Sequence, residues 1–311
     1  MTTTAELALP ARLVKPPKDP FFYGWRYVRS PLPNGETRLE QVPLTRWDVL
    51  HPEEGDFIVT NENHARNCLY LQAALESALS ERPDAKVFFD HRIDWQVPGI
   101  LPHGPDLTAI ENYAGGWNPL RGTFMMREMN ARPLLVVEVT SPSTRETDIN
   151  EKIIEYHAAG IPYYLIADVQ NIEDEMLMTV VGYRATAEGY VRLPNEEDGA
   201  VWIPSVKLWF HPEGLRVICQ DENRKKIPDR IELEQNVRDF LVRAEKAEAR
   251  AEWAENELVT EKQRTKGETQ RAEAEKQRAE AAIQRAEAQA KEIAELRAQI
   301  ANPPTKNNGH N

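Results

Sequence analysis

Residues 132–168 read RPLLVVEVTSPSTRETDINEKIIEYHAAGIPYYLIAD, and this stretch decides the fold class. It opens with an almost continuous apolar run, 134–139, which is typical of a strand covered on both faces of a sheet. A helix is expected over 147–159 and should end at Gly160, and 163–168 reads as a second buried strand. A strand, a loop, a helix and another strand in this order make a crossover unit, which predicts an α/β fold.

Further strand and helix patterns extend this unit in both directions. We expect additional strands at 86–90, 92–95, 105–110, 177–183, 190–193 and 206–210. Helices are expected at 45–50 and 64–80. Residues 112–132 interrupt the pattern and are interpreted as a loop insertion between two sheet strands. The sequence therefore predicts an α/β domain in which helices flank a mixed sheet.

The composition changes sharply near residue 229. Residues 229–302 contain no proline and a single glycine, Gly267. Apolar residues from Leu233 to Ile300 recur at alternating spacings of four and three, which predicts a coiled coil. A solvated single helix held by Glu–Arg and Glu–Lys pairs is the alternative. The predicted parts are an irregular N-terminal arm (1–42), the α/β domain (43–228), a coiled-coil tail (229–302) and a disordered C-terminus (303–311).

Composition excludes several classes of protein. The chain has 38 Lys and Arg against 50 Asp and Glu, a net charge of −12, which argues against broad nonspecific adhesion to nucleic acid. No apolar run is long enough to span a membrane, and the N-terminus lacks a secretory signal. Cys68 and Cys219 form no paired motif, and no nucleotide-binding glycine motif occurs. We expect a soluble, cytoplasmic protein with no membrane partner.

Two carboxylates stand in otherwise apolar strands. Glu138 lies inside the run 134–139, where a lone charge costs several kcal/mol unless it is paired or bound to a cation. Asp106 opens the strand expected at 105–110. Two carboxylates from neighbouring strands and one strand carbonyl would suit a hard divalent cation such as Mg²⁺. A structural ion pair is the alternative interpretation.

The helix after Glu138 carries three polar residues on one face. Asp148, Lys152 and Tyr156 follow one another at intervals of four, so their side chains point the same way. One interpretation is an exposed Asp–Lys pair that adds only a few tenths of a kcal/mol. The other is that Lys152 points over the carboxylate site and stabilises phosphate charge.

Taken together, these residues resemble the Uma-two family of restriction-endonuclease-like proteins, a branch of the PD-(D/E)xK nuclease fold. The resemblance covers roughly residues 40–215, and His64 fits a histidine that opens the family's first long helix. The matching elements are Pro105-Asp106, Glu138-Val139, Ser141-Pro142-Ser143-Thr144, Asp148/Lys152/Tyr156, Gly160-Ile161-Pro162 and Tyr163–Asp168.

The resemblance implies a metal-dependent endonuclease that hydrolyses DNA phosphodiester bonds with a metal-activated water. Asp106 and Glu138 would bind Mg²⁺ or Mn²⁺ together with the Val139 carbonyl. The lysine of the motif would fall at Thr140, so its catalytic role would move to Lys152. The resemblance leaves open the roles of His64, Asp148, Tyr156 and Asp168.

The expected partners are DNA and a second copy of the chain. Residues 1–228 hold 23 basic and 33 acidic side chains, so DNA would need a local basic cleft. We expect that cleft to come from arginines near the site: Arg121, Arg127, Arg132 and Arg145. The tail predicts a homodimer or higher oligomer. The alternative function is a catalytically inactive nuclease-like module that acts in protein association through its coiled coil.

Overall fold

The computed structural model describes residues 18–301. The chain divides into a core unit, which ends at Leu233, and a tail unit, which begins at Glu234. Within the described residues, no helix combines the length and the apolar character needed to cross a membrane.

A six-stranded mixed sheet forms the centre of the core unit, as predicted. Its strand order is β10-β9-β8-β7-β5-β3; β7 and β8 run parallel, and the other neighbouring pairs are antiparallel. The strands are β3 (Lys86–Phe89), β5 (Leu107–Glu111), β7 (Arg132–Val139), β8 (Tyr163–Ile172), β9 (Glu175–Ala185) and β10 (Tyr190–Arg192). The crossover from β7 to β8 is made by a π-helical turn, η1 (Thr147–Glu151), and α3 (Lys152–Ala158).

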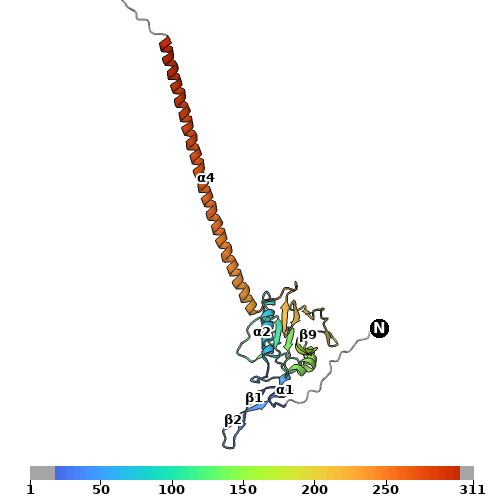
Figure 1. Ribbon diagram of the computed structural model, residues 1–311. Helices are drawn as coiled ribbons and strands as arrows, with labels where there is room; N and C mark the ends of the chain where they lie inside the picture. The colour runs from blue at the N-terminus through green and yellow to red at the C-terminus, as the bar shows by residue number, and fades with distance from the viewer. Residues whose placement is uncertain (1–17, 302–311) are drawn as a thin grey trace, which may run out of the picture. The chain divides into compact units, whose positions relative to one another are not determined.

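The two faces of this sheet are covered by different helices. Helix α2 (Glu62–Ala78) lies beside the sheet (Figure 1). Its Leu71 and Leu75 pack into a cluster that includes Leu135 and Val137 of β7. Val136 belongs to the opposite cluster, with Tyr156 of α3. Because side chains alternate along a strand, Glu138 points to the same face as Val136, toward α3.

Two smaller sheets differ from the predicted arrangement. Residues 112–132, expected as a loop, contain β6 (Thr123–Met125), which pairs in parallel with β4 (Arg92–Asp94) outside the main sheet. Phe124 and Ile93 are fully buried, and this burial holds the short strands in place. The strand expected at 206–210 is β12 (Leu208–Glu213), in a separate sheet between β11 (Val201–Ile203) and β13 (Arg216–Gln220).

The described part of the predicted N-terminal arm is more regular than expected. Strand β1 (Trp25–Pro31) pairs with β2 (Thr37–Pro43) as an antiparallel hairpin. Pro31 and Pro43 stand at strand ends, where a missing N–H does not break the ladder. Residues 1–17 and the predicted disordered segment 303–311 lie outside the described residues. Helix α1 (Arg46–Leu50) follows, and Thr45 and Asp48 form its capping box.

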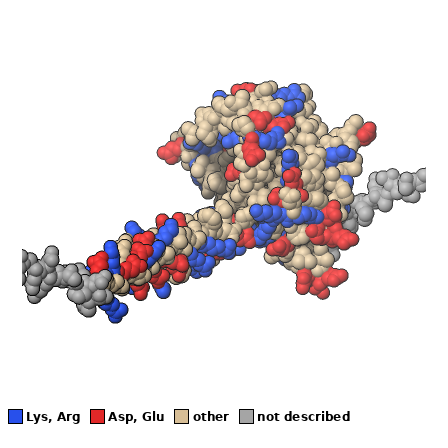
Figure 2. Space-filling view, turned by 90° about the horizontal axis from the view of Figure 1, so that it is seen from above, with Lys and Arg blue, Asp and Glu red and all other residues tan. Residues whose placement is uncertain are grey.

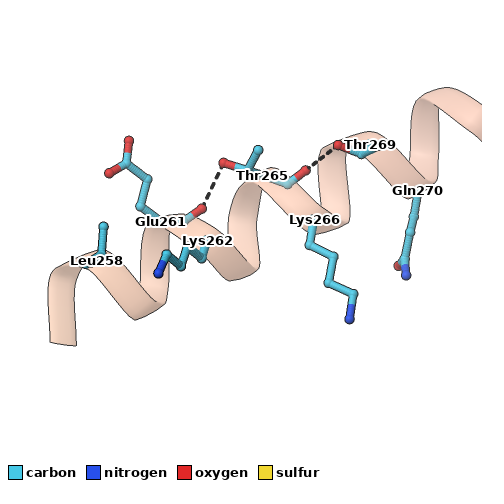
Figure 3. Close-up of a pocket in the computed structure, with 7 residues that line it drawn as sticks. All are labelled: Leu258, Glu261, Lys262, Thr265, Lys266, Thr269 and Gln270. Carbon is cyan, nitrogen blue, oxygen red and sulfur yellow. Dashed lines mark hydrogen bonds between the residues drawn. The ribbon is translucent and has the colours of Figure 1, made fainter. Parts of the chain in front are cut away.

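The tail unit is built on a single helix. Helix α4 (Arg230–Ala301) runs without interruption through Gly267 (Figure 1). Acidic and basic side chains alternate along its surface (Figure 2). Near its middle, the hydroxyls of Thr265 and Thr269 donate to backbone carbonyls one turn earlier, each at 2.9 Å (Figure 3). The shallow hollow at this point is lined by one stretch of a single helix and therefore lacks an opposing wall. The predicted helix is confirmed, and its pairing as a coiled coil stays a prediction.

Candidate active site

Asp106 and Glu138 lie opposite each other at the ends of neighbouring strands. The β5–β7 register pairs Leu107 with Val137, so the next step of the antiparallel ladder brings Asp106 beside Glu138. The backbone N–H of Val139 donates to Asp106 Oδ2 at 2.7 Å. The backbone N–H of Asp106 donates to Glu138 Oε2 at 3.3 Å. Each carboxylate is thus fixed by the backbone of the opposite strand.

From helix α3, Lys152 contacts Glu138 and a third acid, Asp148. Its Nζ lies 2.9 Å from Glu138 Oε1 and 2.8 Å from Asp148 Oδ1. The lysine side chain is 3% exposed and each of these two carboxylates 1%, so the interpretation as an exposed pair is wrong. Burial alone would lower the pKa of Lys152, but the charges of Asp148 and Glu138 raise it above its usual value. The two acids thus favour the charged form of the buried Lys152.

Tyr156, one turn after Lys152, donates to the same oxygen of Glu138 that Lys152 contacts. Its hydroxyl donates to Glu138 Oε1 at 2.6 Å, and its side chain is fully buried. Burial raises the pKa of Glu138 to about 8; Lys152 opposes this rise, and the negative charge of Asp106 adds to it. The pKa of Asp148 is raised for the same reason, with Lys152 opposing. An additional positive charge nearby would therefore stabilise the ionised form of both carboxyls.

His64 connects the start of α2 to the same strand ends. The side chain of Asn61 caps the helix by accepting the His64 backbone N–H at 2.9 Å. The imidazole Nδ1 donates to the Val139 carbonyl at 2.6 Å, and Nε2 lies 3.3 Å from Asp106 Oδ1. Burial would lower the pKa of His64, but Asp106 and the Val139 carbonyl raise it to about 9. The ring therefore bridges two of the groups that the sequence predicts as metal ligands.

A cavity of about 600 Å³ gives access to this cluster. It is lined by Asp106, Glu138, Lys152 and His64, and its other walls include the acidic residues Glu53, Glu54, Asp56 and Asp90. Arg92 also lines it, with its guanidinium bound to the Pro52 carbonyl and to Thr123. The surroundings of the site are therefore mostly acidic.

The arginines expected to supply a basic cleft do not line this cavity. Three of them pair with acids elsewhere: Arg121 with Glu128, Arg132 with Glu111 and Arg145 with Asp168. Proximity in sequence failed as a guide here because Arg132 stands at the start of β7, seven residues from the strand end that carries Val139, and the other three lie in the connections outside β6 and β7. The expectation of a cleft built from these four residues is wrong for this cavity.

Asp168 has a structural environment. It accepts the Thr140 hydroxyl at 2.6 Å and a two-pronged contact from Arg145, whose Nη2 lies 2.8 Å from Oδ2. These bonds tie the loop after β7 to the middle of β8. Asp168 therefore fixes the loop in which the motif's lysine position is occupied by Thr140.

A chain of buried polar side chains supports α3 from the other side. The indole N–H of Trp95 donates to His103 Nδ1 at 2.9 Å, and His103 Nε2 lies 2.8 Å from Glu155 Oε2. An indole nitrogen can only donate, so Nδ1 of His103 accepts and its proton sits on Nε2, facing Glu155. His51 Nε2 is 3.5 Å from the same carboxylate. The proton on Nε2 makes His103 a poor metal ligand, and the chain instead anchors the helix that carries Lys152.

The chemistry of the main cluster fits a hard divalent cation. Its available donors are the carboxylates of Asp106 and Glu138 and the carbonyl of Val139, whose oxygen keeps a second lone pair beside His64. Three acids, counting Asp148, meet the single ammonium of Lys152 and the imidazole of His64. Oxygen donors with excess negative charge are what Mg²⁺ and Mn²⁺ prefer.

Comparison with known proteins agrees with the resemblance read from the sequence. The model of the Uma2 family, described as "Putative restriction endonuclease", matches residues 50–211. A crystal structure described as a "putative nuclease belonging to DUF820" from Anabaena variabilis is 18% identical, with a TM-score of 0.37 over 50% of this chain and 80% of that chain. No curated protein matches the sequence. The family match spans more than half of the chain, and the protein therefore belongs to the Uma2 family.

Proposed function

We propose that this protein is a Mg²⁺- or Mn²⁺-dependent endonuclease that hydrolyses DNA phosphodiester bonds in the cytoplasm. One observation carries the proposal: Asp106 and Glu138 meet at neighbouring strand ends, with Lys152 Nζ 2.9 Å from Glu138, in a single open cavity. In a member of a family described as restriction endonucleases, this acid–acid–lysine group is the natural catalytic centre.

Asp106, Glu138 and the Val139 carbonyl would hold the cation. Once bound, it would supply Lewis acidity toward a phosphate oxygen and would lower the pKa of a water. Tyr156 keeps Glu138 in one orientation through the 2.6 Å hydrogen bond. His64 restrains Asp106 and the Val139 carbonyl together, so the ligands are positioned before the cation arrives.

Lys152 would stabilise the negative charge that develops on the phosphate. Its ammonium contacts Asp148 as well as Glu138. Asp148 would therefore remain its partner if Glu138 bound a metal ion. A lysine at position 140 would extend from the end of the strand that carries Glu138. Lys152 instead reaches the Glu138 carboxylate from α3. The helix thus replaces the missing strand lysine.

The test is a cleavage assay on the full chain. Supercoiled plasmid and end-labelled linear duplex are incubated with Mg²⁺, with Mn²⁺ or with chelator. We expect D106N and E138Q, which preserve side-chain shape, to lose about 10²-fold or more in rate, the scale of losing a metal-stabilised transition state. The matched control is E188Q, at an exposed acid. Isothermal titration with Mn²⁺ should show binding to the wild type and to E188Q only.

A second candidate function is the inactive nuclease-like module. The cavity walls favour it, because Glu54 would repel a phosphate backbone and the nearby cation, Arg26, is already paired with Glu53 and Asp56. Folded wild-type protein that neither cleaves DNA nor binds Mn²⁺ would support this alternative over the nuclease.

We also propose that the chain assembles through α4 as a homodimer or higher oligomer. The apolar residues at the seam positions remain about half exposed on the helix; Val237 is 50% exposed and Leu258 51%. Sedimentation of the full chain, compared with a chain lacking residues 231–311, measures this contribution. Equal association states for the two would contradict the proposal.

A further inference from the structure

We infer that α4 binds the α4 helix of a second copy of this chain in a parallel, in-register coiled coil. This inference rests on the proposed assembly through the tail but not on the nuclease chemistry. It adds the orientation of the partner, which the apolar seam alone leaves open because a heptad seam can pair in either direction.

The apolar seam fixes the heptad register. With Val237, Leu258 and Ile293 at a positions, the d positions include Leu233 and Leu296. Within the described residues, all five side chains are 50 to 53% exposed. Apolar side chains left in water over such a length favour a partner that covers them.

The charges beside the seam are strongly biased. In this register the g positions from 243 to 285 carry six arginines, interrupted by one glutamate: Arg243, Arg250, Glu257, Arg264, Arg271, Arg278 and Arg285. The e positions carry both acidic and basic residues. They include Glu248, Glu255 and Lys262 in the first half of the helix and Arg297 near its end.

A parallel arrangement makes these charges complementary. In a parallel pair, each g residue faces the e residue five positions further along the second copy. Four such pairs have opposite signs: Arg243 with Glu248, Arg250 with Glu255, Glu257 with Lys262 and Glu292 with Arg297. Arg271 with Lys276 is the like-charged pair. Each pair occurs twice in a symmetric dimer, so attraction dominates.

An antiparallel arrangement brings like charges together. In that orientation g residues face g residues, and the arginine row would meet a second arginine row. Arg243 and Arg250 would lie near Arg285 and Arg278 of the second copy. The charge pattern therefore selects the parallel orientation and disfavours the reversed one.

The middle of the seam is its weakest section. Glu261, Glu268 and Glu275 occupy successive d positions and face their own copies in a parallel pair. Lys262 and Lys276 follow two of these acids directly, so each can pair with an acid of the second copy. Arg264 lies 3.0 Å from Glu268 in the same helix. The two ends of α4 must therefore supply most of the association.

Disulfide trapping on the full chain tests the orientation. Single substitutions A254C and A282C place a thiol at d positions on either side of the middle, and A249C and A281C place one outside the seam as matched controls. Residues facing each other in register lie close enough for a disulfide. Cys68 and Cys219 are buried and common to all variants. We expect A254C and A282C each to form a disulfide with its own copy under mild oxidation, and the controls to form little.

Several outcomes would overturn the inference. In an antiparallel pair, a positions face d positions of the second copy. A disulfide formed only when A254C (d) is mixed with A272C (a) would therefore show that orientation. Controls that react as readily as the seam variants would show random collision, and a monomer mass in sedimentation would remove the partner altogether. The last of these also contradicts the proposed assembly, whereas the first contradicts the orientation alone.

A charge exchange provides an independent measurement. R243E together with R250E sets glutamate against Glu248 and Glu255 of the second copy, which should weaken dimerisation about tenfold or more. Adding E248R and E255R restores opposite signs and should bring the dissociation constant back to within about threefold of the wild type. If the variant with all four substitutions did not regain dimer affinity, the parallel pairing would be contradicted.

Discussion

Two ion pairs with the same spacing of four residues lie in opposite environments in this molecule, one buried and one exposed. Asp148 and Lys152 lie four residues apart in the crossover helix, 2.8 Å from each other, with 1% and 3% of their side chains exposed. Arg264 and Glu268 lie four residues apart in α4, 3.0 Å from each other, with 80% and 63% exposed. Spacing makes both pairs possible, and the surroundings decide what each one does.

In the core, the buried charges carry a desolvation cost that their pairing only partly offsets. Desolvation opposes both members of a buried pair, so such pairs add little net stability, yet removal of one member leaves an uncompensated charge. In the tail, water screens the pair and replaces it readily. Perturbed and buried ionisable groups concentrate at functional sites, which is why the pair in α3 marks the candidate site and the pair in α4 does not.

The largest effect should come from removing the buried cation. K152A leaves Glu138 and Asp148 facing each other without a positive charge, and we expect the free energy of unfolding to fall by about 3–5 kcal/mol. Urea denaturation followed by tryptophan fluorescence measures this in the core unit. R264A is the matched control. A loss below about 1 kcal/mol for K152A would erase the contrast between the two pairs.

A smaller loss is expected from the hydroxyl that orients Glu138. Above pH 8, where Glu138 is ionised, Y156F removes one hydrogen bond to a buried carboxylate while keeping the ring, and should lower the free energy of unfolding by about 1.5–3 kcal/mol. Y164F, which removes the hydroxyl bonded to the Asp148 carbonyl, is a neutral-acceptor comparison and should lose about 0.5–1.5 kcal/mol. Equal losses would mean that the charge of Glu138 does not strengthen its bond.

Breaking the support of α3 should cost about as much as losing one buried hydrogen bond. E155A leaves the N–H of His103 without its carboxylate, so we expect a loss of about 1–3 kcal/mol in unfolding free energy. E155Q retains an acceptor oxygen and should lose less. I154A serves as the control because Ile154, on the same helix, is 71% exposed. An E155A protein as stable as I154A would show that this chain does not anchor α3.

The smallest effect belongs to the exposed pair. R264A should reduce the stability of α4 by about 0.3–0.5 kcal/mol at low salt, and by less in 1 M NaCl because salt screens surface charges. Thermal melting followed by circular dichroism at 222 nm measures the difference. A loss that is independent of salt would point to packing of the arginine stem rather than to its charge.

The sequence predicted the parts of the fold that local patterns encode. The run LLVVEV, the helix ended by Gly160 and the following buried strand predicted the crossover, and the structure confirms the mixed sheet around it. Glu138 and Asp106 stood out because charge is unusual in buried strands. The predicted catalytic role of Lys152 depended on the family resemblance, because its spacing from Asp148 suits an exposed ion pair equally well.

Local sequence patterns could not predict the contacts between segments that are distant in the sequence. The bond from His64 to the Val139 carbonyl joins residues 75 positions apart, and the bond from His103 to Glu155 spans 52. The hairpin at 25–43 was missed because its prolines suggested irregular chain, although they fall at strand ends. The prediction of a basic cleft was wrong for the same reason, because Arg121, Arg132 and Arg145 pair with acids outside the cavity.

The hydrogen bond from the Val139 N–H to Asp106 Oδ2 has an evolutionary consequence. The carboxylate substitutes for a main-chain acceptor where the β5–β7 ladder ends, so the sheet itself depends on it. Selection for folding would preserve Asp106 even in a descendant that lacks the proposed activity. The same holds for the buried Lys152, whose loss should destabilise the core. Among relatives, retention of these two residues therefore marks the shared architecture and is not by itself a sign of catalysis.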